Sequence, residues 1–246
     1  MTFRLRSSSK TLKAVFKALE EVDSEPLFVF RKDKVLAWGM DPSHVIFVSL
    51  EINPNFFSSY TFDGKKPLKL CISASEVAAW FLGKTYEAEI GYEDGSLELV
   101  IYTASSKIKK SVAILEEKTP PPPVDLNFFA SVTIPSADLH EGFNLISKDS
   151  VDTVIDLSDN KFRMISKEKR AMYEPYLDEG AVKVTDDGVL RRMYKTEFLK
   201  MAINSAKTLA ENVTFELSKE GVLRIVFEVE NLKVTYYIAP ILEEEG

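Results

Sequence analysis

The sequence predicts an α+β protein built from two similar domains. Three observations support this prediction: strand-like segments outnumber helical ones, four consecutive prolines divide the chain near its middle, and apolar positions of the first half recur in the second. A few helices among many short strands that follow one another directly are typical of the α+β class. At 246 residues, each half is long enough to bury a core of its own.

Each half is expected to contain a strand, a helix, a run of short strands, a second helix and further strands. The helices start near capping residues, and their apolar positions recur every three or four residues. Hairpins with polar turns follow the first helix of each half. We predict helices at 9–22, 74–82, 137–147 and 196–210, hairpins at 27–38 and 151–164, and further strands at 45–52, 88–91, 97–103, 213–217 and 232–238.

The two halves correspond position by position. Segment 95–101 resembles segment 221–227 at an offset of 126 residues. The apolar face of the first helix recurs 127 residues later, with Leu12, Phe16 and Leu19 matching Leu139, Phe143 and Ile146. A shared offset across a helix and a later strand favours an internal duplication over chance.

The four prolines at 120–123 mark the domain boundary, because consecutive prolines favour extended polyproline II and cannot form a helix or a central strand. We therefore expect a first domain at 1–115, a Pro-rich connector at 116–127 and a second domain at 128–246.

Composition and charge exclude several classes of protein. No run approaches the roughly 20 apolar residues that span a bilayer, and the N-terminus lacks the apolar stretch of a secretory signal. The single cysteine, Cys71, excludes an intrachain disulfide and is expected to be a small buried hydrophobe of an intracellular protein. A net charge of −7 means that any contact with nucleic acid must come from a local basic patch.

No catalytic, metal or cofactor site is predicted. Neither His44 nor His140 has a cysteine or carboxylate partner at metal-ligand spacing, and no glycine-rich phosphate loop occurs. The serines at 7–9 before Lys10 are better interpreted as a helix cap than as a nucleophile. The acidic residues at 20–23 and 243–245 are interpreted as solvated charge runs.

The first helix has a separate basic face. Lys10, Lys13 and Lys17 fall within a sector of about 60°, opposite the apolar residues. Two interpretations remain open: an ordinary solvated face, or a surface for phosphates that would bind without sequence preference and with strong salt dependence. Other helices add fewer polar groups, namely Lys84, Lys148 beside Glu141, and the stripe of Lys200, Asn204 and Lys207.

Two distant segments resemble signature segments of one family, the sliding clamps of the proliferating cell nuclear antigen (PCNA) type. They are Met40-Asp41-Pro42-Ser43-His44-Val45 and Tyr236-Tyr237-Ile238-Ala239-Pro240. The layout of the whole chain also resembles a subunit of this family, in which two similar domains each place two helices inside a ring and antiparallel sheets outside. The family has a DNA clamp fold, and the resemblance is to an archaeal-like subunit.

The resemblance implies a DNA sliding-clamp subunit without enzymatic activity. Three subunits would close a ring around duplex DNA and act as a processivity factor in replication and repair. Implied partners are DNA polymerase, flap endonuclease, DNA ligase and the clamp loader, in the cytoplasm or nucleoid of an archaeon or the nucleus of a eukaryote. The DNA-facing residues would then be Lys10, Lys13, Lys17, Lys84, Lys148, Lys200 and Lys207.

The resemblance also implies a pocket for partner peptides, bound as a helix in a groove and supported by main-chain pairing to the connector and the C-terminal tail. Its residues would be Met40, His44, Val45 and Phe47 from the loop and strand, Pro123 and Leu126 from the connector, and Tyr237, Ile238, Ala239 and Pro240 from the terminus. Without the family, Met40 and Val45 would be interpreted as ordinary core.

Three features depart from the family. Val222 stands where a proline is common, the connector is richer in proline and stiffer, and the third helix carries little positive charge. A stiffer connector can change partner choice. The uneven lining resembles archaeal clamps made of distinct paralogues, so homotrimer and heterotrimer both stay open.

The ring requires a head-to-tail contact between edge strands of neighbouring subunits. Segment 108–115 is the expected edge of the first domain and segment 181–184 that of the second, so that lysines meet the acidic residues Glu174, Asp178 and Glu179. The expected interface residues are Ile108, Lys109, Lys110, Val112, Ile114, Ala181, Val182 and Val184. Two alternatives from other classes remain: a subunit of a DNA-damage checkpoint ring without a working peptide pocket, and an unrelated two-domain α+β enzyme.

Overall fold

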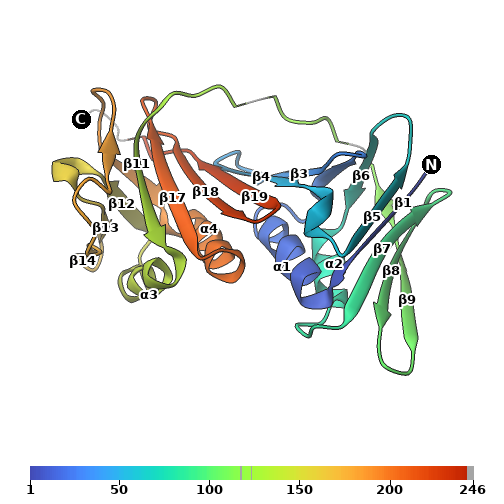
Figure 1. Cartoon of the computed structure of the whole chain (residues 1–246). Helices are drawn as coiled ribbons and strands as arrows, with labels where there is room; N and C mark the ends of the chain where they lie inside the picture. The colour runs from blue at the N-terminus through green and yellow to red at the C-terminus, as the bar shows by residue number, and fades with distance from the viewer. Residues whose placement is uncertain (117, 123, 243–246) are drawn as a thin grey trace. The chain divides into compact units, whose positions relative to one another are not determined.

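The structure, a computed structural model, describes residues 1–116, 118–122 and 124–242. The chain forms two compact units (Figure 1). The first comprises Met1–Pro122 with Val229–Val234, and the second comprises Pro123–Glu228 with Thr235–Gly246. The acidic run at 243–245 and the connector residue Pro123 lie outside the described residues.

The first unit consists of two antiparallel sheets and two helices. One sheet has the strand order β5-β1-β7-β8-β9, and the other places its first-unit strands in the order β10-β6-β2-β3-β4. The helices α1 and α2 contact each other, and α1 also contacts β1 and β7. The elements are β1 (Thr2–Ser8), α1 (Ser9–Glu20), β2 (Leu27–Phe30), β3 (Val35–Met40), β4 (Ile46–Ile52), η1 (Pro54–Phe56), β5 (Ser59–Asp63), β6 (Leu68–Ile72), α2 (Ala74–Trp80), β7 (Glu87–Glu93), β8 (Ser96–Tyr102), β9 (Lys107–Val112) and β10 (Ile114–Leu115).

The second unit repeats this plan with two sheets and a pair of contacting helices, α3 and α4. Its strands are ordered β19-β18-β17-β11-β15 in one sheet and β14-β13-β12-β16 in the other. The elements are β11 (Phe128–Pro135), α3 (Ser136–Ser147), β12 (Asp152–Asp156), η2 (Ser158–Asn160), β13 (Arg163–Ser166), β14 (Ala171–Tyr173), β15 (Lys183–Val184), β16 (Arg191–Lys195), α4 (Thr196–Leu209), β17 (Asn212–Ser218), β18 (Leu223–Val229) and β19 (Leu232–Ile238). The prediction of an α+β fold with four helices and antiparallel sheets is confirmed.

Positions that correspond between the halves are buried in both units. All six apolar residues that match at the 127-residue offset in the first helices are at most 5% exposed. In the first unit, the rings of Phe3 and Phe30 stack with centroids 3.9 Å apart, and in the second, Phe162 and Phe215 lie 5.2 Å apart. Fully burying such a side chain contributes roughly 1.5–3 kcal/mol, so these apolar faces determine where each helix packs.

Helices α1 and α2 begin at serine caps, as predicted, and end slightly early, whereas α3 and α4 begin without a side-chain cap hydrogen bond. The hydroxyl of Ser8 accepts a hydrogen bond from the Thr11 N–H at 3.0 Å and caps α1, which ends at Glu20 rather than at residue 22. Helix α2 ends at Trp80 rather than at residue 82, because Phe81 is extended (ψ 133°) and completely buried. Burial of an aromatic ring here overrides the helical pattern.

The expectation of one edge strand over 108–115 is wrong. Strand β9 ends at Val112 in one sheet, whereas Ile114 pairs with Ile72 of β6 in the other. The chain therefore changes sheets at Ala113, so that Ile114 does not belong to the edge that β9 presents. The predicted strand at 181–184 is reduced to β15, which pairs with β11.

Candidate functional site

The predicted basic face of α1 is present in the first unit. Lys10 and Lys17 are exposed and Lys13 is half-buried, whereas the apolar face of the helix is buried. Lys17 forms an ion pair with Glu20 at 2.7 Å, so part of its charge is neutralised locally. Lys84 is exposed beyond α2, with its ammonium 5.9 Å from the centroid of the Tyr86 ring.

The second unit has a related but weaker basic face. Lys200 and Lys207 are exposed on α4, and Lys148 is exposed at the end of α3. His140 of α3 lies beside Asn204 and Lys207 of α4. Burial, and then the charge of Lys207, lower the pKa of His140, which outweighs the opposing hydrogen bond with Asn204. The charge of Lys207 is therefore felt by α3 at His140.

The segment that resembles the first clamp signature is a loop organised by one carboxylate. Asp41 is 8% exposed, and its Oδ1 accepts the backbone N–H groups of Val45 and Ile46, both at 2.7 Å. Its Oδ2 accepts the N–H of Ser43 at 2.9 Å and the Ser43 hydroxyl. His44 takes a positive φ of 59°, which few residues other than glycine adopt. The aspartate therefore holds a strained turn between β3 and β4.

The same hydrogen bonds set the protonation state of this aspartate. Burial acts to raise the pKa of Asp41, but the hydrogen bonds from Ser43, Ile46 and Val45 together outweigh it and hold the pKa below its ordinary value. The loop is thus anchored by a charged acceptor at neutral pH, and it leaves Met40 and His44 exposed.

A largely apolar groove of about 380 Å³ lies next to this loop, within the first unit. One side is formed by Trp38, Gly39, Met40 and Phe47 of β3 and β4. The other side is the connector at 118–122, and Asp23 and Leu27 complete the lining. Of the predicted pocket residues, Met40 and Phe47 line this groove, while His44 and Val45 belong to the adjoining loop.

The connector is fastened to the first unit at Lys118. The Lys118 ammonium lies 3.1 and 3.2 Å from the two carboxylate oxygens of Asp23, and the Lys118 N–H donates to Cys71 Sγ at 3.4 Å. A glycine is required at position 39 next to Asp23, because a Cβ there would lie 2.8 Å from the Asp23 Cβ. Cys71 is buried, as its alternating segment predicts.

The second signature segment belongs to the second unit. Ile238 is completely buried, which suits support of the segment better than direct contact with a partner. Tyr237, Ala239 and Pro240 are half-buried. The Tyr237 ring lies 6.5 Å from that of Phe128, and the Arg224 guanidinium stacks 3.8 Å above the Phe128 ring.

Two further predicted positions lie in this unit. Leu126 is half-buried. Val222, which stands where the family often has proline, donates its N–H to the Ser218 hydroxyl at 3.1 Å. This hydrogen bond stabilises the turn into β18, and a proline could not form it.

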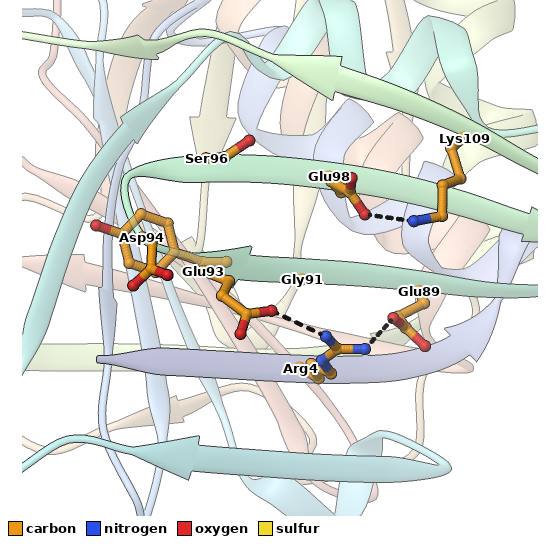
Figure 2. Close-up of a pocket in the computed structure, with 9 residues that line it drawn as sticks. Arg4, Glu89, Gly91, Glu93, Asp94, Ser96, Glu98 and Lys109 are labelled. Atoms are coloured by element: carbon orange, nitrogen blue, oxygen red, sulfur yellow. Dashed lines mark hydrogen bonds and ion pairs between the residues drawn. The ribbon is translucent and has the colours of Figure 1, made fainter.

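A second depression, of about 350 Å³, lies on the sheet of β1, β7, β8 and β9 (Figure 2). Arg4 lies between Glu93 at 3.2 Å and Glu89 at 3.6 Å, and Lys109 contacts Glu98 at 3.0 Å. Burial acts to raise the pKa of Glu89. Hydrogen bonds from Arg6 and Tyr102, together with the charges of Arg6 and Arg4, outweigh this effect, so the pKa lies below its ordinary value. Because these carboxylates are already paired, the depression is a structural ion-pair network.

The predicted subunit-interface residues fall on different elements. Ile108 is 46% exposed on β9, an edge strand of its sheet, while Val112 at its end is 5% exposed. Lys109 and Lys110 are paired with Glu98 and Glu76 inside the unit. In the second unit Ala181 is half-buried, Val182 is 5% exposed and Val184 is 42% exposed.

Sequence reasoning missed most of the groove lining, including Trp38, Asp23 and Lys118. Trp38 alternates with buried residues in β3, which places it on the other face of the strand. The alternation does not tell whether that face is open to solvent or lines a groove. Asp23 and Lys118 are 95 positions apart, and each was hidden in a charged run. Among residues 1–116, 118–122 and 124–242, no group of three or more His, Cys, Asp or Glu side chains could hold a metal ion. No helix in that part of the chain is long and apolar enough to cross a membrane.

The chain resembles known clamps over nearly its full length, although no family model matches it. It is 25% identical over 248 residues to the DNA polymerase sliding clamp of Nitrosopumilus maritimus, covering 99% of this chain and 100% of the relative. It is 24% identical over 240 residues to DNA polymerase sliding clamp 1 of Sulfurisphaera tokodaii, covering 95% and 96%.

Solved structures agree. The A. fulgidus PCNA bound to the C-terminal region of FEN-1 superposes with a TM-score of 0.82 at 20% identity, covering 99% of this chain and 100% of that one. PCNA from Entamoeba histolytica gives 0.80 at 20% identity, covering 98% and 99%.

The two duplicated units, each with two sheets and a helix pair, define the class of DNA clamp folds. The full-length similarity to archaeal sliding clamps, together with this fold, supports the predicted resemblance to sliding clamps of the PCNA type. The predicted resemblance of the whole chain to these clamps is thereby confirmed.

Proposed function

We propose that this chain is one subunit of a trimeric ring that encircles duplex DNA and tethers replication and repair enzymes as a processivity factor. The observation that carries the proposal is the clamp fold, matched over 99% of the chain. Neither the checkpoint-ring subunit nor the unrelated enzyme gains support from these similarities. The proposal treats the chain as a scaffold without catalysis, working with the intracellular replication machinery.

The exposed lysines of α1 and α4 support a role in DNA contact. Side chains that offer charge but no base-reading groups bind phosphates regardless of sequence. The net charge of −7 is compatible with this role, because the basic residues are concentrated on particular helix faces. Lys84 and Lys148 are proposed to add to the same surface.

The groove beside the 40–46 loop is proposed as part of the docking site for partner peptides. Its apolar lining and its exposed Met40 suit a segment with apolar anchors. The FEN-1 peptide of the A. fulgidus complex is the natural probe. DNA polymerase, ligase and the clamp loader are proposed to compete for this site.

The experiment that tests the function is primer extension on a primed circular template with an archaeal polymerase and clamp loader. The chain is expected to lengthen the products, and Lys10→Ala/Lys13→Ala/Lys17→Ala to shorten them increasingly as salt rises. Products no longer with the clamp than without it would contradict the proposal.

Ring closure is tested separately by analytical ultracentrifugation. A homotrimer would sediment near three times 27.8 kDa. A monomer that trimerises only with a paralogous chain would instead assign it to a heterotrimer. If the chain stays monomeric both alone and with a paralogous chain, the ring is excluded. The edge strand β9, with exposed Ile108, is the proposed contact on the first unit.

A further inference from the structure

The connector side of the groove has an unusual chemistry. Pro120, Pro121 and Pro122 all line the groove, and a proline has no backbone N–H. Within 118–122, only Lys118 and Thr119 carry one, and that of Lys118 is directed to Cys71 Sγ. Any main-chain hydrogen bond between a partner and residues 120–122 must therefore have the partner as donor.

An extended peptide cannot pair regularly with such a wall. Strand addition requires the receiving edge to offer donors and acceptors in alternation, and three successive residues here offer acceptors alone. A helical segment does not need main-chain hydrogen bonds to the connector, because its own backbone N–H and C=O groups pair within the helix. Its apolar side chains can pack against the proline rings and against Trp38 and Phe47 across the groove.

The wall is also held in place. The ion pair between Lys118 and Asp23 fixes the start of the connector, and Asp23 is itself anchored by accepting the N–H groups of Glu25 at 2.8 Å and Met40 at 3.4 Å. Polyproline segments are stiff, so 120–122 cannot easily turn away to expose another edge. The groove is consequently preorganised and does not need to be ordered by the partner.

We propose that this connector makes the groove selective for partner segments that dock as a helix with apolar anchors, and that it gains nothing from strand-forming residues that flank the helix. This inference rests on the proposed peptide-docking function. It replaces the expectation of main-chain pairing to the connector, at least along 120–122. The selectivity arises from the absence of donors rather than from the shape of the groove.

The test uses the full chain and two labelled peptides derived from the FEN-1 C-terminal region. One contains the helical anchor segment alone, and the other adds a short strand-forming flank on the connector side. On the unmodified chain, we expect both peptides to bind within a factor of about two in fluorescence polarisation. On Pro121→Ala/Pro122→Ala, which restores two N–H donors, the flanked peptide should gain roughly fivefold over the anchor peptide. Pro67→Ala, an exposed proline that is not part of this groove, is the matched control.

The outcomes separate the two proposals. If the flank improves binding equally on both chains, or on neither, the inference about donors is overturned and the docking groove stands. If the anchor peptide fails to bind the folded, unmodified chain, the groove assignment and the inference fall together. The anchor peptide also reports any loss of packing that the alanines cause, independently of the flank.

Discussion

Replacing Asp41 should loosen the loop that borders the groove. The carboxylate accepts three backbone N–H groups, from Ser43, Val45 and Ile46, at 2.7–2.9 Å. In Asp41→Ala all three lose their partner. A buried donor without a partner costs about 1–3 kcal/mol, and only Ile46 is fully buried while the other two can reach water. Counting about 2 kcal/mol for Ile46 and about 0.5–1 for each of the other two gives a loss of about 3–4 kcal/mol.

The variant Asp41→Asn separates charge from geometry. Its amide oxygen can still accept from Val45 and Ile46, but its amide N–H₂ faces the Ser43 N–H, so we expect a loss of about half that of alanine. Urea denaturation gives the change in free energy of unfolding, and hydrogen exchange at the Ile46 N–H reports the loop itself. Asp33→Ala, an exposed aspartate in the preceding hairpin turn, should change stability by less than about 0.5 kcal/mol.

Acid provides a second check on the same aspartate. Its pKa is lower in the folded chain than the ordinary 3.8, so its contribution is fully present above 3.8 and is lost as pH falls through the folded value. The difference between the unmodified chain and Asp41→Asn should therefore be constant from pH 7 to 5 and shrink below about 3.8. An Asp41→Ala chain as stable as Asp33→Ala, with unchanged exchange at Ile46, would refute the argument.

Four further predictions concern the basic helix faces, the edge strand β9 and the connector. Alanine at the three α1 lysines should weaken DNA binding and leave the unfolding midpoint unchanged. The slope of log affinity against log salt concentration should fall by up to about 3, and an unchanged slope would exclude phosphate contact. His140 should titrate below pH 6.5 by NMR, and adding duplex DNA should raise its pKa; no change on saturation with DNA would place α3 away from phosphates. Ile108→Asp should abolish any trimer, whereas Leu145→Asp, more exposed on α3, should not; an intact Ile108→Asp trimer would place the contact elsewhere. Lys118→Met should weaken the anchor peptide by about 0.5–1 kcal/mol, and equal weakening by Lys107→Met would show a general charge effect.

The fold was predictable because its signals are local and repeated. The apolar residues of 9–20 return 127 positions later and are buried in both units, so either half supports the interpretation of the other. Errors arose where one tertiary contact outweighed a pattern. Phe81 ends α2 by entering the core. At Ala113 the chain leaves one sheet for the other, whereas the prediction had merged β9 and β10 into a single strand.

The site was less predictable because its parts are brought together by long-range contacts. The 40–46 loop was recognisable as a motif, yet the role of Asp41 as a shared acceptor depends on backbone geometry that the motif does not encode. The groove depends on Lys118 reaching Asp23, 95 positions away, and on Gly39 leaving room for it. Periodicity cannot reveal a pair of this kind, since each residue alone looks like surface charge.

The duplication itself shows where the two halves diverged. At the offset of 127 that preserves the apolar face, Lys10, Lys13 and Lys17 are replaced by Ala137, His140 and Asn144. The core of the helix is thus retained while its exposed cations are lost. The single titratable replacement, His140, has a lowered pKa, so at neutral pH α3 is uncharged at these three positions. A nearby cation comes from α4 through Lys207. In the proposed complex, a duplex would meet the lysines of α1 but no cation at the matching positions of α3. Binding would then be uneven around each subunit, which makes proton uptake by His140 on DNA binding the most direct measure of whether α3 takes part.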